Sequence, residues 1–231
     1  MEDLSTMNIN TLNETIISCR KCERLVAWRE AIAVRKTRAY RTWEYWGKPV
    51  PGFGDINGRV LVLGLAPGAH GSNRTGRMFT GDGSGDFLFP ALHRAGFANQ
   101  AQSISMGDGL QVSDMFITAV CRCAPPDNKP TKTEIENCMP YAMREIELMK
   151  NLQIVVTLGS IAHSEAIRYF GRIYAGQSIA KFKHNGLTQL ADPPLTILSS
   201  YHPSRQNTQT GRLTVSMFDE IWQTVNLYLK K

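Results

Sequence analysis

The fold of this chain is decided by the apolar run Arg59–Leu65, RVLVLGL, and by the glycine-rich segment Gly64–Phe89, GLAPGAHGSNRTGRMFTGDGSGDFLF, into which it runs. The first stretch is a continuous apolar run, which is typical of a strand buried on both faces of a parallel sheet. The second places small residues, backbone amides and arginines at the carboxyl end of that strand, where open α/β sheets bind ligands. A similar segment, Tyr201–Thr214 (YHPSRQNTQTGRLT), follows another apolar run, Leu195–Ser199. The two segments together predict a ligand-binding edge of a sheet.

Strands and helices alternate along the rest of the chain. Further strands are predicted at Met115–Val120 and Ile154–Leu158. Helices are predicted over residues 11–34, 86–95, 133–149 (with Thr131 or Thr133 as cap), 160–170 and 213–229. This alternation predicts an α/β fold, with three α/β/α layers and a central, four-stranded, mainly parallel sheet. We expect residues 1–231 to form a single domain with an N-terminal helical extension.

Composition and charge narrow the function classes. The 231 residues are 42% hydrophobic and carry a formal net charge of +6, which fits a globular protein and permits binding to a polyanion. No apolar run approaches the ~20 residues that are needed to cross a bilayer. The acidic, polar N-terminus is unlike a signal peptide. We therefore expect a cytoplasmic protein that does not associate with membranes.

Cations stand where a ligand is expected to bind. A basic run interleaved with aromatic residues extends from Trp28 to Trp46. Within the two glycine-rich segments there are further arginines: Arg74, Arg77, Arg205 and Arg212. Charge alone is equally consistent with a mildly basic protein that binds no polyanion. Cations beside candidate reactive groups favour a polyphosphate chain as the substrate, with these arginines as its contacts.

The cysteines indicate a metal centre. Cys19 and Cys22 form a CxxC pair, and fourteen residues separate Cys123 from Cys138. A disulfide framework explains this poorly in an intracellular protein, and a redox CxxC pair favours a βαβ context, whereas this pair falls in a predicted helix. Four thiolates on two distant segments suit a tetrahedral zinc ion or an iron–sulfur cluster, and their spacing does not choose between them. Cys121, in a predicted apolar strand, is expected to be a buried hydrophobic residue.

The two segments and the cysteines together resemble family 5 of the uracil-DNA glycosylase superfamily. GLAPGAHGSNRTGRMFTGD is similar to the family's first motif and SYHPSRQNTQTGRLT to its last. PVPGFGD, CRCAPPDNKPT and the cysteine spacing also match, so the likeness extends over almost the whole chain from Cys19 onward. The resemblance implies a four-stranded parallel sheet, a 4Fe-4S cluster, and hydrolysis of the N-glycosidic bond of deaminated bases in DNA.

The resemblance also implies roles for individual residues. Asp82 would handle the attacking water, and His202 would donate a hydrogen bond to the departing base. Phe79 would stack on the base after it has been flipped out of the duplex. Further polar groups around the base and the reaction centre would come from Ala66 (through its backbone amide), Asn128 and Asn207. The cluster ligands would be Cys19, Cys22, Cys123 and Cys138.

Two positions depart from the wider superfamily and resemble family 5. Leu65 stands where many relatives have Asn, Asp or Glu, and Ala119 or its neighbour stands where family 4 has an asparagine that reads the edge of uracil. Without that amide the pocket is expected to accept hypoxanthine and xanthine as well as uracil. The motifs contain no lysine placed as a Schiff-base nucleophile, so we expect an abasic site as product, with no strand cut.

Two other functions stay open at this point. A DNA- or RNA-binding module with a structural metal would use the same basic residues, and an iron–sulfur electron carrier would use the same cysteines. For the glycosylase we expect a monomer that acts on double- or single-stranded DNA at the nucleoid. A sliding clamp is left open as a further partner.

Overall fold

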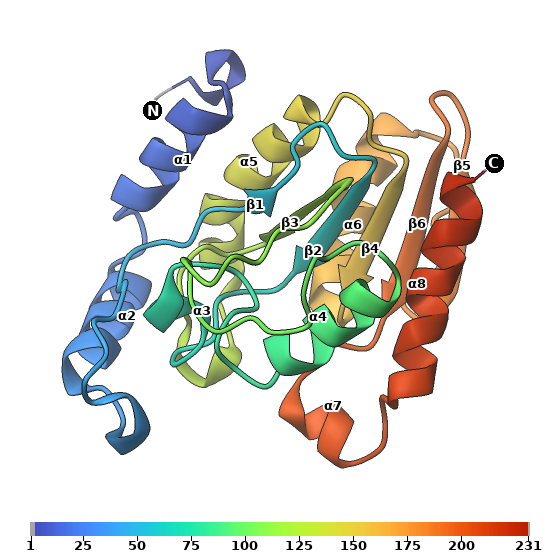
Figure 1. Cartoon of the computed structure of the whole chain (residues 1–231). Helices are drawn as coiled ribbons and strands as arrows, with labels where there is room; N and C mark the ends of the chain where they lie inside the picture. The colour runs from blue at the N-terminus through green and yellow to red at the C-terminus, as the bar shows by residue number, and fades with distance from the viewer. Residues whose placement is uncertain (1–2, 231) are drawn as a thin grey trace.

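The computed structural model describes residues 3–230, and one mixed β-sheet lies at its centre (Figure 1). Over these residues the sheet has six strands, in the order β1-β3-β2-β4-β6-β5. Their bounds are Phe53–Gly54 (β1), Val60–Gly64 (β2), Met115–Ala119 (β3), Ile154–Leu158 (β4), Gly186–Leu190 (β5) and Leu195–Ser200 (β6). The four predicted strands are β3, β2, β4 and β6, and each is parallel to its neighbours in this series. The predicted α/β class and parallel centre are confirmed.

The expected number of four strands is wrong, because two short strands extend the sheet at its edges. β1 pairs antiparallel with β3, and β5 pairs antiparallel with β6. β1 is only two residues long. β5 has the sequence GLTQL, in which only Thr188 and Leu190 are buried. Neither strand has the continuous apolar run by which the buried parallel strands were found.

Helices cover both faces of the sheet (Figure 1). On one face α5 (Lys132–Leu148) and α6 (Ser160–Ile173) contribute to a core with the side chains of Leu61 and Leu63. On the other face α4 (Gly85–Arg94) and α8 (Val215–Leu229) contribute to a core with those of Val60 and Val62. β2 is thus buried on both sides, as its uninterrupted apolar sequence predicts. Thr131 caps α5 through a capping box with Glu134.

The N-terminal part forms two helices and not the single helix predicted over residues 11–34. α1 spans Ile9–Ser18, α2 spans Glu23–Arg35, and Cys19 and Cys22 lie in the turn between them. No glycine or proline occurs at this turn, so nothing in the local pattern marks the break. α1 packs on α5 through the buried side chains of Leu12 and Ile16. The extension therefore lies against the main body at α5.

Among the helices of residues 3–230, none combines the length and the apolar character that a bilayer crossing requires.

Candidate active site

Asp82 lies in the loop between α3 (Ser72–Thr75) and α4, in the segment that follows β2 at the carboxyl edge of the sheet. Its Oδ1 accepts hydrogen bonds from the backbone amides of Ser84 (3.0 Å) and Gly85 (3.2 Å), at the start of α4. Its Oδ2 accepts none from the described residues, and it faces two glycines. A Cβ added at Gly71 would lie 1.8 Å from Oδ2, and one at Gly68 would lie 2.7 Å from it. Burial raises the pKa of Asp82, although the two amides oppose this shift.

Phe79 stands three residues before Asp82 in a conformation that the surrounding glycines permit. Its φ is +52°, in the left-handed region that is costly for a bulky residue. A Cβ at Gly85 would lie 1.9 Å from the carbonyl oxygen of Phe79, and one at Gly64 would lie 2.7 Å from Cζ of its ring. The ring is therefore held against the last residue of β2, with 8% of the residue exposed.

His202 follows β6 and reaches the same place from a distant part of the chain. The centroid of its ring lies 6.0 Å from that of Phe79, with an angle of 32° between the ring planes. A Cβ at Gly159, directly after β4, would lie 3.3 Å from Cβ of His202. Burial lowers the pKa of His202 to about 4, so the imidazole is neutral at neutral pH. Neither ring nitrogen has a hydrogen-bond partner within residues 3–230.

Arg205 brings a positive charge to Asp82. It is the first residue of α7 (Arg205–Gln209) and its side chain is exposed. A Cβ at Gly83 would lie 2.8 Å from Nε of Arg205, so this side chain lies over the residue next to Asp82. Its charge acts to lower the pKa of Asp82, against the effect of burial. The loops after β2 and β6 thus meet at two places, Phe79 with His202 and Gly83 with Arg205.

Arg74 is buried, so its guanidinium is not available to the phosphate contact that the sequence predicts. Its guanidinium lies over the rings of Tyr40 and Trp43, at 3.8 and 4.0 Å from their centroids. It also donates a hydrogen bond to the carbonyl oxygen of Gly81 at 2.7 Å. The sequence pattern does not predict this contact, because alternating basic and aromatic residues in the 28–46 run can lie either on the surface or in the interior. Arg74 instead joins that run to the loop of Asp82.

Arg77 is also buried, so it too is not available to contact a phosphate. It forms an ion pair with both oxygens of Asp108, at 2.9 and 2.8 Å from Nη2. Asp108 also accepts hydrogen bonds from the amides of Ile104, Ser105 and Leu110. Although burial opposes it, these bonds and the Arg77 guanidinium hold the pKa of Asp108 well below its ordinary value. The pair fixes the 101–110 loop beside the loop of Asp82.

The remaining sequence candidates take different positions. Asn207 donates from Nδ2 to the carbonyl oxygen of His202 at 2.8 Å and so supports its backbone. Arg212 is exposed, and its guanidinium lies 4.6 Å from the ring centroid of Tyr201. The backbone amide of Ala66 donates to no acceptor within residues 3–230. Asn128 is exposed in the 3-10 turn Pro126–Asn128, and within residues 3–230 its side chain forms no hydrogen bond with the residues around Phe79.

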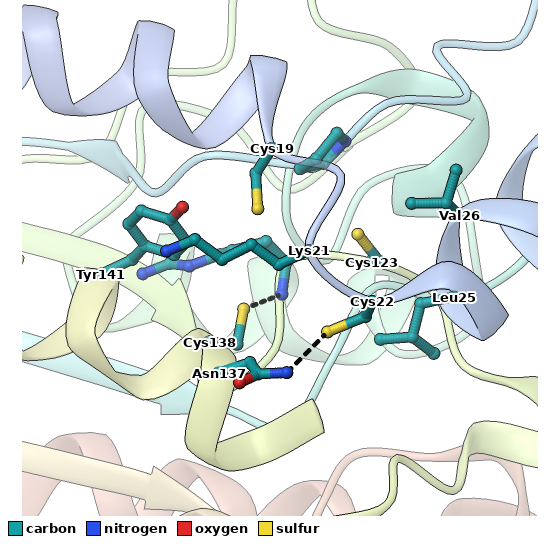
Figure 2. A pocket seen from close by; sticks show the side chains of 11 residues that line it. Cys19, Lys21, Cys22, Leu25, Val26, Cys123, Asn137, Cys138 and Tyr141 are labelled. Atoms are coloured by element: carbon teal, nitrogen blue, oxygen red, sulfur yellow. Dashed lines mark hydrogen bonds between the residues drawn. The ribbon is translucent and has the colours of Figure 1, made fainter. Parts of the chain in front are cut away.

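The four cysteines of the predicted ligand set line one pocket (Figure 2). Cys19 and Cys22 come from the turn between α1 and α2, Cys123 from the loop after β3, and Cys138 from α5. The sulfur of Cys22 accepts a hydrogen bond from Nδ2 of Asn137 at 3.6 Å. Over residues 3–230, no three His, Cys, Asp or Glu side chains converge closely enough to hold a single metal ion. The sulfurs therefore surround a shared space without meeting at one point.

Two residues outside the predicted ligand set contact it. Arg29, in the basic run from Trp28 to Trp46, is 2% exposed and donates from Nη1 to the sulfur of Cys123 at 2.8 Å. Burial raises the pKa of the Cys123 thiol to about 12, and Arg29 offsets part of this effect. Cys121 is fully buried, as expected, and its thiol is hydrogen-bonded to Cys138, which raises the pKa of Cys121.

The carboxyl edge of a parallel sheet here gathers a carboxylate, a neutral imidazole and an aromatic ring, which defines an α/β protein with a candidate ligand site at that edge. The chain belongs to the uracil DNA glycosylase superfamily, whose sequence profile matches residues 51–226. The expectation drawn from the motifs is thereby confirmed.

Individual relatives lie in two types of this superfamily. The chain is 48% identical over 217 residues to the type-5 uracil-DNA glycosylase of Mycobacterium tuberculosis, with 94% of this chain and 80% of the relative covered. It is 49% identical over 212 residues to the type-5 uracil-DNA glycosylase of Thermus thermophilus, with 90% and 92% covered. The type-4 uracil-DNA glycosylase of Pyrobaculum aerophilum is 29% identical over 200 residues, with 86% and 84% covered. The similarity to type 5 is thus the stronger of the two.

Proposed function

We propose that this protein is a uracil-DNA glycosylase that releases deaminated bases from DNA by hydrolysing the N-glycosidic bond. The observation that carries the proposal is the contact between the loop of Asp82 and the loop after β6, where the ring centroid of Phe79 lies 6.0 Å from that of His202 and Arg205 lies over Gly83. The names of the type-5 relatives support the same activity.

Asp82 is proposed to hold the attacking water and to offset positive charge on the sugar. Bond breaking has oxocarbenium character at the sugar, so a nearby carboxylate stabilises the transition state. Oδ1 is fixed by two backbone amides, and Oδ2 has no hydrogen bond from the described residues. Oδ2 can therefore accept a hydrogen bond from a water molecule and direct it toward the substrate.

His202 is proposed to donate a hydrogen bond to a carbonyl oxygen of the departing base. The base takes up negative charge as the bond breaks, and a donor aimed at that charge lowers the barrier. Because burial keeps His202 neutral, one ring nitrogen carries a proton and needs no preceding ionisation. Phe79 would lie against the face of the same base, since its ring is next to that of His202.

The direct test is Asp82→Asn, which removes the charge and keeps the shape. We expect release of uracil from a single-uracil oligonucleotide to fall by about 10²-fold or more, while the affinity for that oligonucleotide stays within a few-fold of the original. Asp86→Asn, an exposed position in the first turn of α4, is the matched control and is expected to cut normally. Normal cleavage by the Asp82→Asn protein would show that another group handles the water.

We further propose that the base pocket accepts hypoxanthine and xanthine as well as uracil. Ala119 pairs with Gly64, the residue against which the ring of Phe79 lies, and neither has a side-chain amide that could restrict the pocket to the edge of uracil. A panel of duplexes that carry one uracil, hypoxanthine or xanthine measures the range directly. Release of uracil alone would contradict the wider range and leave the glycosylase proposal intact.

We propose that the reaction ends at an abasic site. None of the lysines lies within Gly64–Phe89 or Tyr201–Thr214, so no amine in the two motif segments is placed to attack the sugar. The intact abasic strand is expected to be cut only after alkali treatment. Strand cutting by the enzyme alone, with a protein–DNA adduct trapped by borohydride, would contradict this.

We propose a 4Fe-4S cluster held by Cys19, Cys22, Cys123 and Cys138. A single zinc ion needs all four sulfurs about 2.3 Å from one point, and the described residues offer no such convergence. In a four-iron cluster each thiolate binds a different iron, so four sulfurs around a shared pocket suit it better. When bound, the cluster would join the α1–α2 turn to β3 and α5, which is a structural role. Iron and sulfide content, with the visible absorption spectrum, test the assignment against zinc.

We propose that the protein acts at the nucleoid, where its DNA substrate lies. We also propose that it is a monomer. Light scattering of the purified protein, with and without a duplex, tests the monomer. A sliding clamp as a further partner is tested by the same measurement with the clamp added.

A further inference from the structure

An ordered loop beside the active site holds two apolar side chains in solvent. Ile104 and Met106 are 56% and 54% exposed, whereas Ser103 and Leu110, on either side of them, are 3% and 8% exposed. We refer to residues 104–106 as the apolar tip. A loop that buries its flanks and exposes its most apolar residues places those residues for contact with something outside the protein.

The apolar tip is held rigidly. Asp108 accepts hydrogen bonds from the amides of Ile104, Ser105 and Leu110, and it is paired with the buried Arg77. The base of the loop is closed by Asn99, whose Nδ2 donates to the carbonyl oxygen of Gly109 at 2.9 Å. The exposed side chains therefore extend from a fixed platform.

This platform is bonded directly to the loop of Asp82. The amide of Gly81 donates to the carbonyl oxygen of Ser103 at 2.8 Å, and the hydroxyl of Ser103 donates to that of Thr80 at 2.8 Å. A Cβ at Gly81 would lie 3.1 Å from the carbonyl oxygen of Ile104. The apolar tip thus begins against the residue before Asp82.

Gly83, the residue after Asp82, lies under the side chain of Arg205. The residues on either side of Asp82 in the chain therefore contact the backbone at the start of the apolar tip and an exposed arginine. A strand of DNA offers a partner to each, stacked bases to the apolar tip and phosphates to the arginine.

We propose that Ile104 and Met106 form an apolar wedge that packs against the bases next to the everted nucleotide. This inference rests on the proposed function and names a contact that serves base extrusion. Everting a base leaves its neighbours unstacked, and apolar side chains inserted there offset part of that cost. Two side chains are far too few for a stable protein interface, which takes roughly 20–30 residues a side, so DNA is the occupant that we assign.

The test compares a double variant, Ile104→Ser with Met106→Ser, with the original protein on two substrates. On a duplex with a paired uracil, kcat/KM is expected to fall on the order of tenfold, because extrusion loses the wedge. On a single strand with one uracil, where no duplex has to be opened, it is expected to change by less than about twofold. Fluorescence of a 2-aminopurine placed beside the uracil is expected to report less unstacking in the duplex.

Control variants separate the wedge from other causes. Ile104→Leu with Met106→Leu keeps apolar volume and is expected to retain activity on the duplex. Val34→Ser, at a residue of α2 that is 81% exposed, removes an exposed apolar side chain elsewhere and is expected to have no effect. Thermal unfolding of each variant checks that folding is unchanged.

The outcomes distinguish the wedge from the proposed function. Equal activity of the double Ser variant and the original protein on the duplex would overturn the wedge. An equal loss on duplex and single strand would also overturn it, since the tip would then serve the chemistry or the fold. If the original protein released no base from either substrate, the proposed function itself would be wrong.

Discussion

At Asp82, two glycines allow the carboxylate to lie where it does. Gly71 and Gly68 leave open the space into which Oδ2 extends, and any side chain at Gly71 would overlap that oxygen. Glycine is therefore required at Gly71 for a reason of space and not only for its backbone freedom. The position of the Asp82 carboxylate therefore depends on the lack of a side chain at Gly71.

Gly71→Ala is expected to abolish most cleavage. The added Cβ would lie 1.8 Å from Oδ2 of Asp82, so the carboxylate or the loop must move. Since misplacement of a catalytic group by about 1 Å can cost about 10²-fold in rate, we expect a loss of this order in single-turnover release of uracil. Gly171→Ala in α6 meets no atom within 4 Å and is the control, with activity unchanged. Full activity of the Gly71→Ala protein would show that the position of Oδ2 is not critical.

His202 is expected to make the fold less stable in acid. The pKa of His202 is about 4 in the folded protein and 6.5 in the unfolded chain. Between these two pH values the imidazole is protonated in the unfolded chain and neutral in the folded protein. The free energy of unfolding therefore decreases as the pH falls from 7 to 5, by about 2 kcal/mol from this group. His202→Asn is expected to reduce that decrease in urea unfolding experiments.

At the scale of elements, the N-terminal extension and the loop of Asp82 are joined by several contacts. The amides of Trp46 and Gly47 donate to the carbonyl oxygens of Arg74 and Asn73 in α3 (Ser72–Thr75), at 2.9 and 3.0 Å. Nδ2 of Asn73 donates to the carbonyl oxygen of Arg29 in α2 at 3.2 Å. The segment that holds two of the cysteines therefore also holds the loop that carries Asp82.

Arg74→Lys is expected to loosen that joint. A lysine cannot lie flat over the rings of Tyr40 and Trp43 while donating to Gly81, because its ammonium is compact and not planar. We expect kcat for uracil release to fall several-fold to about tenfold, with little change in KM because Arg74 is only 3% exposed. The exposed Arg38→Lys is the matched control. A rise in KM with kcat unchanged would instead return Arg74 to DNA binding.

At the scale of the whole molecule, the cysteine pocket links parts of the chain that the sheet does not hold together. The turn between α1 and α2 meets the loop after β3 and helix α5 at this pocket (Figure 2). The extension also touches the main body through α1 against α5 and through α2 against α3. Removal of the proposed cluster is therefore expected to free the extension first and the loop of Asp82 as a consequence.

Cys123→Ser and Cys121→Ser separate a proposed ligand from a buried neighbour. Cys123→Ser is expected to lose iron and to lower the melting temperature by roughly 5–10 °C, because binding of a metal centre contributes to folding. Cys121→Ser is expected to retain iron, although it too replaces a buried thiol. The iron content of each purified protein and its thermal unfolding give the answer. Full iron in the Cys123→Ser protein would contradict the proposed ligand set.

The sequence by itself determined the parallel centre of the sheet, because burial on both faces leaves a continuous apolar run at each of β2, β3, β4 and β6. It also determined the helices that cover the sheet and the family, through long glycine-rich motifs. The edge strands β1 and β5 left no such run, since each is short or only partly buried.

Only the tertiary structure decided which arginines are available to a ligand. Arg74 and Arg205 stand in similar glycine-rich segments, yet one is buried over aromatic rings from the N-terminal extension and the other is exposed beside Asp82. The physical reason is that the contacting residues are far apart along the chain. Periodicity reports the neighbours of a residue along the chain, whereas burial, ion pairing and the meeting of Phe79 with His202 depend on segments that only folding brings together.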